Sequence, residues 1–432
     1  MTRSIGLDFG TTNSALAIAE SATQVDLAQF AYQGGAGPTF RSVLFFDGEP
    51  PARGQRPGSV AGPRAIERYL DASGAGRLLQ SLKSFVASPL FRATNIFGVT
   101  YTLEELIAVL LTHLRVEAET QFGSLGRRIV LGRPVRFVNA EPDATDEFPL
   151  SRLRAAAALA GFDDVVFEYE PVAAAYFYEA SLDHDELVLI ADFGGGTSDF
   201  SLMRVGPGVR SRGRRDTDLL GTEGVGLAGD AFDSEVVDHV VAPRLGKGSA
   251  YRSYFDGKAI PVPPWIFDKL RRWHHLSFLK SRETMHFLHE LRATAIEPEK
   301  IDALLHVIDD GLGYALYHSV EMTKLALSSS LETTLSFVDG PVNISQLIAR
   351  PTFDAWIGEE LAAIAASVDR LLARTGLAIS DVDRVFLTGG TSFVPAVRGL
   401  FTTRFGESRI SAGNELTSVA AGLALRALDF TA

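Results

Sequence analysis

Short apolar segments recur along the chain and alternate with longer segments in which apolar residues return at helical spacing. The short segments are typical of buried strands, and the longer ones are typical of helices. The predicted strands are 5–9, 16–19, 42–46, 129–131, 134–138, 165–169, 187–191, 200–205 and 385–387. The predicted helices are 103–118, 150–160, 172–180, 301–328, 353–374 and 416–428. Their alternation predicts α/β layers rather than a helical bundle or a β-sandwich.

Several helix ends are marked by residues that cap them. Thr102 stands just before 103–118 and Glu105 follows three positions later, which predicts a capping box. Gly161 ends the helix that precedes it, and Pro171 opens the helix that follows it. The polar, glycine-rich segment 206–218 predicts an exposed loop.

Two segments share one plan, which is a strand, Asp-Phe-Gly, a turn of small residues and a second strand. They are IGLDFGTTNSALAI, which contains Asp8, and LIADFGGGTSDFSLMRV, which contains Asp192, 184 positions later. The repetition predicts two similar lobes, each presenting one hairpin to a shared cleft.

The turns of these hairpins have the chemistry of a phosphate site. Backbone N–H groups can approach an anion closely at Gly10, Gly194, Gly195 and Gly196, and hydroxyl donors are supplied by Thr11, Thr12 and Thr197. The carboxylates of Asp8 and Asp192 would repel a phosphate, so they indicate Mg²⁺ between them and the phosphates, bound directly or through water. An ordinary tight turn is the alternative, and two copies of one pattern weaken it. A Walker A motif is absent, which excludes a P-loop enzyme.

Two further segments carry candidate chemistry with open alternatives. A third glycine turn contains Gly389, Gly390, Thr391 and Ser392. It would suit a flat base and ribose, or it is an ordinary strand-to-helix loop. Glu170 is either a carboxylate in the cleft or a first-turn glutamate that the helix dipole favours.

The composition is that of an ordinary globular protein, with 46% hydrophobic and 22% charged residues. The net charge of −12 disfavours nucleic-acid binding. The absence of cysteine excludes disulfides and thiolate metal sites, and it fits a cytoplasmic protein. No apolar run approaches about 18 residues and no signal-peptide pattern opens the chain, so we expect no membrane span and no targeting segment.

Five segments in order resemble the nucleotide-binding domain of the seventy-kilodalton heat-shock chaperones, within the actin-like ATPase superfamily. They are the two hairpin segments, VFLTGGTSFVPAVRGLF, FEYEPVAAAYFY and GVGLAGDAFDSEVV. The resemblance covers almost the entire chain except roughly 244–310. It implies an α/β actin-like ATPase fold of two lobes, each built on a ribonuclease-H-like mixed sheet flanked by helices. Lobe I would span 1–183, with subdomain IA at 1–35 and 102–183 and IB at 36–101. Lobe II would span 184–432, with IIA at 184–243 and 329–432 and IIB at 244–328, including a helical insertion at about 244–300.

The resemblance also implies an Mg-dependent ATPase that binds ATP and ADP. The catalytic residues would be Lys83, Glu170, Asp192 and Thr197, with the Lys83 ammonium beside the γ-phosphate. A surface lysine on a helix is the alternative for Lys83. The metal residues would be Asp8, Asp192 and Glu170 around the water shell of Mg²⁺, with Asp199 helping to hold K⁺. The nucleotide-binding residues would be Gly10, Thr11, Thr12, Asn13, Gly194, Gly195, Gly196, Thr197, Gly229, Asp230, Glu321, Lys324, Ser328, Gly389, Gly390, Thr391 and Phe393.

Three departures from the family limit the prediction. Leu325 and Phe393 stand where the family has base-stacking arginines, so base preference is open, although Phe393 can stack on a base itself. Residues 244–292 hold ten basic and four acidic residues, a charge of +6 that leaves −18 elsewhere. This insertion is either a docking arm for a protein partner or a solvated helical hairpin. Lastly, the chain stops at LALRALDFTA, and we expect a bacterial member with the ATPase domain but no peptide-binding domain.

Three functions remain open at this point. The intact set of Asp8, Lys83, Asp192 and Thr197 favours an ATPase with a chaperone-related or regulatory role through a partner. The alternatives are a nucleotide-binding adaptor with little hydrolysis and a small-molecule kinase of the same superfold.

Overall fold

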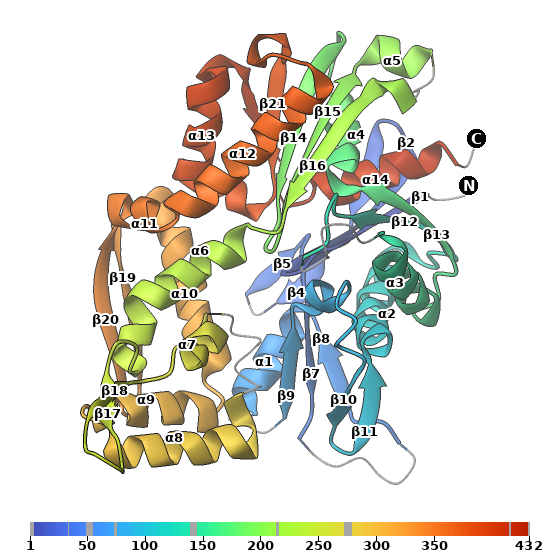
Figure 1. Ribbon diagram of the computed structural model, residues 1–432. Helices are drawn as coiled ribbons and strands as arrows, with labels where there is room; N and C mark the ends of the chain where they lie inside the picture. Colours follow the sequence, from blue (N-terminus) through green and yellow to red (C-terminus); the bar gives the residue numbers. More distant parts are fainter. Residues whose placement is uncertain are drawn as a thin grey trace. The chain divides into compact units, whose positions relative to one another are not determined.

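The computed structural model describes residues 4–32, 34–48, 55–72, 76–138, 145–212, 216–271, 279–413 and 416–430 (Figure 1). The chain divides into two compact units. Unit 1 comprises Met1–Ala228, Ala363–Phe393 and Val397–Ala432, and unit 2 comprises Gly229–Ala362 and Val394–Ala396. Both predicted phosphate hairpins and the third glycine turn therefore lie in unit 1.

Two sheets of unit 1 share one strand order and one set of strand directions. The first contains β1 (Ser4–Phe9), β2 (Asn13–Ser21), β3 (Gln24–Leu27), β6 (Phe40–Arg41), β12 (Arg128–Arg133) and β13 (Asp164–Tyr169). The second contains β14 (Glu186–Phe193), β15 (Ser198–Val205), β16 (Leu219–Val225), β21 (Arg384–Thr388) and β22 (Ile410–Ala412). Their orders are β3–β2–β1–β12–β13, with β6 also paired to β2, and β16–β15–β14–β21–β22. In each sheet three antiparallel strands are joined by two strands parallel to the first, so the sequence repeat is a repeat of topology.

Helix α14 (Ser418–Leu428) packs on β1 and β2 and on helix α4 (Glu170–Glu179). The contact is so close that two positions in it leave no room for a side chain. A Cβ added to Gly6 of β1 would lie 2.2 Å from the backbone nitrogen of Ala424. A Cβ added to Gly422 would lie 1.7 Å from the carbonyl oxygen of Ala173. Glycine at these two positions therefore sets how closely α14 approaches the sheet and α4.

On the first sheet lie α2 (Leu103–Phe122) and α3 (Glu147–Leu159), which pack on each other around a large apolar cluster. Thr102 and Glu105 form the predicted capping box at the start of α2. The remaining elements of unit 1 are β4 (Phe30–Tyr32), β5 (Gly35–Gly37), β7 (Val43–Phe46), β8 (Ser59–Ala61), α1 (Pro63–Asp71), β9 (Arg77–Gln80), the 3₁₀ helix η1 (Leu82–Phe85), β10 (Ala93–Ile96), β11 (Val99–Thr102), α5 (Pro207–Ser211) and α13 (Pro395–Phe405).

Within the described residues, unit 2 is built mainly of helices and contains two hairpins, β17–β18 and β19–β20. Its elements are α6 (Gly229–Val236), β17 (Ala250–Arg252), β18 (Ala259–Pro261), α7 (Trp265–Leu270), α8 (Arg282–Thr294), α9 (Pro298–Asp309), α10 (Gly313–Ser329), β19 (Glu332–Asp339), β20 (Val342–Ala349) and α11 (Arg350–Trp356), and α12 (Gly358–Thr375) continues from it into unit 1. The predicted insertion forms β17, β18, α7 and α8, and α8 packs against α9 (Figure 1). Residues 272–278 of the insertion lie outside the described residues.

Several predicted elements were wrong in detail. Residues 134–138 are not a strand, because Pro134 has no N–H for a ladder and the next N–H groups bond elsewhere. The predicted helix 301–328 is two helices, α9 and α10, because Gly311 adopts φ 68° between them. The predicted helix 353–374 is likewise α11 and α12, with Gly358 opening the second. The loop 206–218 includes the short helix α5, and the hairpin of β19 and β20 was not predicted.

Candidate functional site

The two predicted hairpins form as expected at the ends of β1 and β14. Asp8 pairs across β1 and β2 with Ala15, and Asp192 pairs across β14 and β15 with Asp199. A Cβ at Gly10 would lie 2.0 Å from the carbonyl oxygen of Asn13, so the first turn requires glycine. In the second turn the Gly194 N–H donates to the Thr197 carbonyl at 2.9 Å.

The two turns lie beside each other. A Cβ built on Gly196 would be 3.6 Å from Thr11 Oγ1, which is ordinary van der Waals contact. Backbone N–H groups and hydroxyls from both halves of the repeat are therefore present in one place. Such a concentration of donors is what an anion with several oxygens needs.

Lys83 is not a surface lysine. Its Nζ donates to Glu170 Oε1 at 2.6 Å, and only 9% and 8% of the two side chains are exposed. Glu170 is the first residue of α4, where the helix N-terminus favours a carboxylate. A Cβ at Gly132 of β12 would come 3.2 Å from Glu170 Cγ, so glycine at that position leaves room for the glutamate.

Three more carboxylates surround this ion pair: Asp192 and Asp199 are buried, and Asp8 is half-buried. Burial, followed by the charge of Glu170, raises the pKa of Asp8 to about 7 and that of Asp199 also to about 7. The same causes raise the pKa of Asp192 well above its usual range, with Asp8 and Asp199 adding to the effect. Burial alone would lower the pKa of Lys83, but Glu170 and Asp8 outweigh it and raise that pKa. The site therefore holds an excess of negative charge that one ammonium does not balance.

Asp199 also ties the second hairpin to the end of β12. Its Oδ1 accepts the backbone N–H of Val135 at 2.7 Å and that of Arg136 at 3.4 Å. Nearby, the buried guanidinium of Arg133 donates to the Pro134 carbonyl at 3.0 Å and lies 4.6 Å from the centre of the Tyr169 ring. These contacts were not predicted, although an arginine and a proline that end a buried strand were a signal for them.

The third glycine turn lies against the second hairpin. Thr391 Oγ1 donates to the Gly194 carbonyl at 2.9 Å. Gly389 adopts φ 81°, and a Cβ there would lie 2.1 Å from the carbonyl oxygen of Phe193, so this close approach requires glycine. Phe393, at the end of the turn, keeps 45% of its surface exposed.

The other predicted nucleotide residues lie in unit 2. Half-buried Lys324 donates to Asp233 Oδ2 at 2.7 Å and to the Gly229 carbonyl at 3.1 Å. Ser328 Oγ donates to the Lys324 carbonyl at 3.2 Å, one turn back on α10. Glu321 is half-buried on the same helix, and Asp230 is half-buried on α6. Leu325, where the family has an arginine, is 56% exposed.

Comparison with known proteins decides the family. A family model described as "Hsp70 protein" matches residues 88–248 and 305–428, which is more than half of the chain. The chain belongs to the Hsp70 family. The gap between the two matched segments falls on the predicted insertion, while the first hairpin and Lys83 precede the matched residues.

Curated Hsp70 relatives align with nearly the whole chain. "Chaperone protein DnaK" of Thermosipho melanesiensis is 24% identical over 98% of this chain and 58% of its own length. The proteins of that name from Thermosipho africanus and Thermus thermophilus are 26% and 25% identical, over 98% and 99% of this chain and 58% and 61% of their own lengths. The chain thus spans about three fifths of the length of these relatives.

Within the described ranges, every helix is too short or too polar to traverse a lipid bilayer.

Proposed function

We propose that this chain binds ATP together with Mg²⁺ and hydrolyses it to ADP and phosphate. The observation that carries the proposal is the buried pair of Lys83 and Glu170 among the carboxylates of Asp8, Asp192 and Asp199, beside two glycine turns. Membership of the Hsp70 family, one of nucleotide-binding, chaperone-like ATPases, supports the same function.

The donor set fits a magnesium ion. Mg²⁺ prefers oxygen ligands and usually retains several waters, and the four acidic side chains offer only carboxylate oxygens. No group of three or more acidic or histidine side chains among the described residues is arranged to hold a metal directly. We therefore propose that Asp8, Asp192 and Glu170 hold Mg²⁺ through its water shell, with Asp199 beside a K⁺ ion. When bound, the divalent ion would neutralise charge on the phosphates and on these carboxylates.

The chain's own groups account for the remaining chemistry. In hydrolysis a water oxygen bonds to the γ-phosphorus while the bond to the bridging β–γ oxygen breaks, so catalysis is mostly positioning and charge stabilisation. The turn N–H groups and the hydroxyls of Thr11 and Thr12 would bind the phosphate oxygens. The ammonium of Lys83, held charged by its carboxylates, would face the γ-phosphate, and the Thr197 hydroxyl would orient the water.

The residues proposed for the base and the ribose fall into two sets, which belong to unit 1 and unit 2. Gly389, Gly390 and Thr391 would support the ribose, and the exposed ring of Phe393 would stack on the base in place of a family arginine. On α6 and α10 the residues proposed for adenosine are Gly229, Asp230, Glu321, Lys324 and Ser328. Comparison of ATP and GTP binding by calorimetry tests this part, because equal affinities would contradict a site selective for adenine.

Phosphate release from purified protein with ATP and Mg²⁺ tests the hydrolysis. Lys83→Ala and Asp8→Asn should each lower the rate by about a hundredfold, the usual effect of losing one group that stabilises the transition-state charge. Lys258→Ala is the matched control, because Lys258 pairs with Asp256 at 3.0 Å on an exposed hairpin. An inactive wild type, or a Lys83→Ala variant as active as wild type, would refute the proposal. ATP binding without phosphate release would favour the adaptor.

A role with a protein partner, through the insertion at 244–300, stays a prediction. So do the division into four subdomains and any chaperone-related activity.

A further inference from the structure

The segment that carries Lys83 has an unusual backbone. Ser81 adopts φ 55° and ψ 30°, a left-handed conformation that costs a non-glycine residue roughly 1 kcal/mol or more. The 3₁₀ helix η1 follows, with the Ser84 N–H donating to the Ser81 carbonyl at 3.0 Å and the Val86 N–H donating to the Lys83 carbonyl at 3.1 Å. A conformation of this kind persists only when surrounding contacts determine it.

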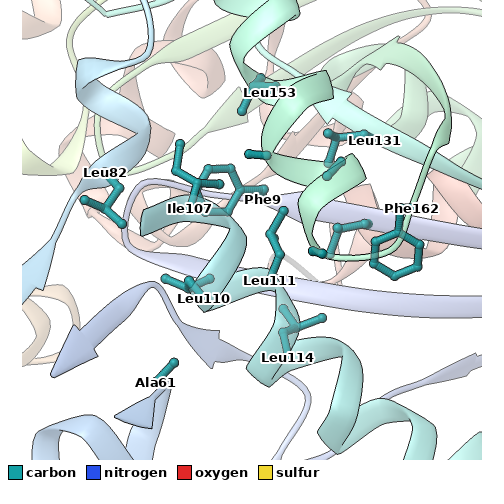
Figure 2. Packing of buried hydrophobic residues seen from close by; sticks show 14 of the residues in the cluster. Phe9, Ala61, Leu82, Ile107, Leu110, Leu111, Leu114, Leu131, Leu153 and Phe162 are labelled. Atoms are coloured by element: carbon teal, nitrogen blue, oxygen red, sulfur yellow. The ribbon is translucent and has the colours of Figure 1, made fainter. Parts of the chain in front are cut away.

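One side of η1 is fixed by apolar packing. Leu82 is 4% exposed and belongs to the same buried cluster as Ile107 and Leu110 of α2 and Leu153 of α3 (Figure 2). Packing of Leu82 orients the neighbouring Lys83 away from this cluster, toward Glu170. Apolar packing cannot satisfy backbone carbonyls, and the segment that follows Lys83 presents several of them; the carbonyl of Phe85 accepts the Ser88 N–H at 3.0 Å.

A single guanidinium reaches those carbonyls. Arg152, the neighbour of Leu153 on α3, is 6% exposed. Its Nη1 donates to the Ser88 carbonyl at 3.1 Å, with longer contacts of 3.4 Å and 3.5 Å to the carbonyls of Phe85 and Val86. Its Nη2 donates to the Phe91 carbonyl at 3.0 Å. Four carbonyls of the segment that follows Lys83 therefore converge on one side chain.

The guanidinium is itself held in place. Its Nε donates to Glu104 Oε1 at 2.5 Å, and Glu104 lies in the first turn of α2, where a carboxylate is favoured. A planar group with five donors in a fixed fork can serve all these partners at once, whereas the ammonium of a lysine is a point donor. Arg152 thus joins α2, α3 and η1.

We propose that Arg152 is a positioning residue for hydrolysis, which fixes η1 so that the Lys83 ammonium stays at Glu170 and at the γ-phosphate. The proposal rests on the proposed function of Lys83. Arg152 touches no nucleotide in this scheme and acts only through the segment that Lys83 occupies.

Arg152→Gln and Arg152→Lys test the proposal, and Arg115→Gln is the matched control. Arg115 also pairs with a carboxylate, Glu119, at 3.0 Å and donates to two carbonyls, those of Ala160 and Gly126, in other segments of unit 1. Both kinds of variant lose a guanidinium that spans backbone carbonyls. Only the Arg152 variants lose the one that holds η1.

The first measurement is amide hydrogen exchange on the full chain without nucleotide. Exchange at residues 82–91 should accelerate in both Arg152 variants and stay as in wild type in Arg115→Gln. Because Arg152→Lys keeps the charge and the aliphatic stem, it serves if Arg152→Gln does not fold. Unchanged exchange at 82–91 would overturn the proposal, even if the protein hydrolysed no ATP and the proposed function had failed.

The second measurement is turnover with ATP. A misplaced catalytic group costs roughly tenfold to a hundredfold in rate, so kcat should fall by about that factor while KM changes by less than about twofold. The fall should vanish in a Lys83→Ala background, because Arg152 acts through Lys83. Equal fold-losses in the presence and absence of Lys83 would show an independent structural role and refute the inference.

Discussion

Replacing Gly422 by alanine tests the close packing of α14 on α4. The new Cβ would lie 1.7 Å from the carbonyl oxygen of Ala173 and 2.4 Å from its carbonyl carbon. Both obstructing atoms belong to the backbone of α4, so no side-chain rotation relieves the clash. The two helices must separate by roughly 1.3 Å to restore the closest approach of about 3.0 Å that Cβ atoms show.

The expected loss of stability follows from two opposing terms. Overfilling a packed region costs about 1–3 kcal/mol, and a clash with backbone belongs near the upper limit. Alanine is favoured over glycine within a helix by about 1 kcal/mol, which offsets part of that cost. We expect the free energy of unfolding to fall by about 2 kcal/mol, or several degrees in Tm.

Urea unfolding of Gly422→Ala beside Gly399→Ala measures this effect. Gly399 lies within α13, and a Cβ there meets nothing within 4 Å. This control should gain up to about 1 kcal/mol from helix propensity. Because α4 begins at Glu170, Gly422→Ala should also slow phosphate release. A Gly422→Ala variant as stable as wild type would refute the argument from packing.

Two further predictions concern single residues. Ser81→Gly should raise the free energy of unfolding by about 1 kcal/mol and Ser81→Val should lower it, because glycine adopts φ 55° without strain and a β-branched residue does not; equal free energies of unfolding would contradict a strained backbone. Burial raises the pKa of Asp233 to about 7 despite Lys324, so the folded protein binds a proton that the unfolded chain releases between about pH 4 and pH 7. The free energy of unfolding should therefore decrease as pH rises through this window, by at most about 1.4 kcal/mol per pH unit, and Asp233→Asn should flatten the decrease. Urea titrations at about pH 5 and pH 7.5 measure this change in the free energy of unfolding. An equal change in wild type and in Asp233→Asn would count against this assignment.

The features that the sequence predicted correctly are those that depend on residues close together in the chain. The Thr102 cap, the glycine turns and the strands of both hairpins depend on residues within a few positions, and all of them form. The strand predicted at 134–138 does not form, because its backbone depends on a distant residue: the N–H of Val135 donates to Asp199, 64 positions away. An apolar run cannot reveal a partner so distant in sequence.

The candidate site likewise has a part that the sequence predicted and a part that depends on contacts between distant segments. The family resemblance selected Lys83, but its burial against Glu170 depends on the approach of η1 to α4. Arg152 had no motif, and its sequence neighbours are Ser151 and Leu153, as in any amphipathic helix. Its importance comes from carbonyls more than sixty positions earlier in the chain.

The matching order of the two sheets has a consequence for protein engineering. In each sheet the chain leaves the antiparallel strands at Leu27 of β3 or Val225 of β16 and returns to the parallel ones at Arg128 of β12 or Arg384 of β21, with the short strand β6 rejoining the first sheet in between. Doubling the length of such an excursion adds only about 0.6 kcal/mol of closure entropy, because the cost grows with the logarithm of length. Exposed turns within these two excursions, rather than the residues where they begin, are thus natural acceptor points, where a reporter domain can be grafted while the hydrogen-bonded strands on either side keep their register.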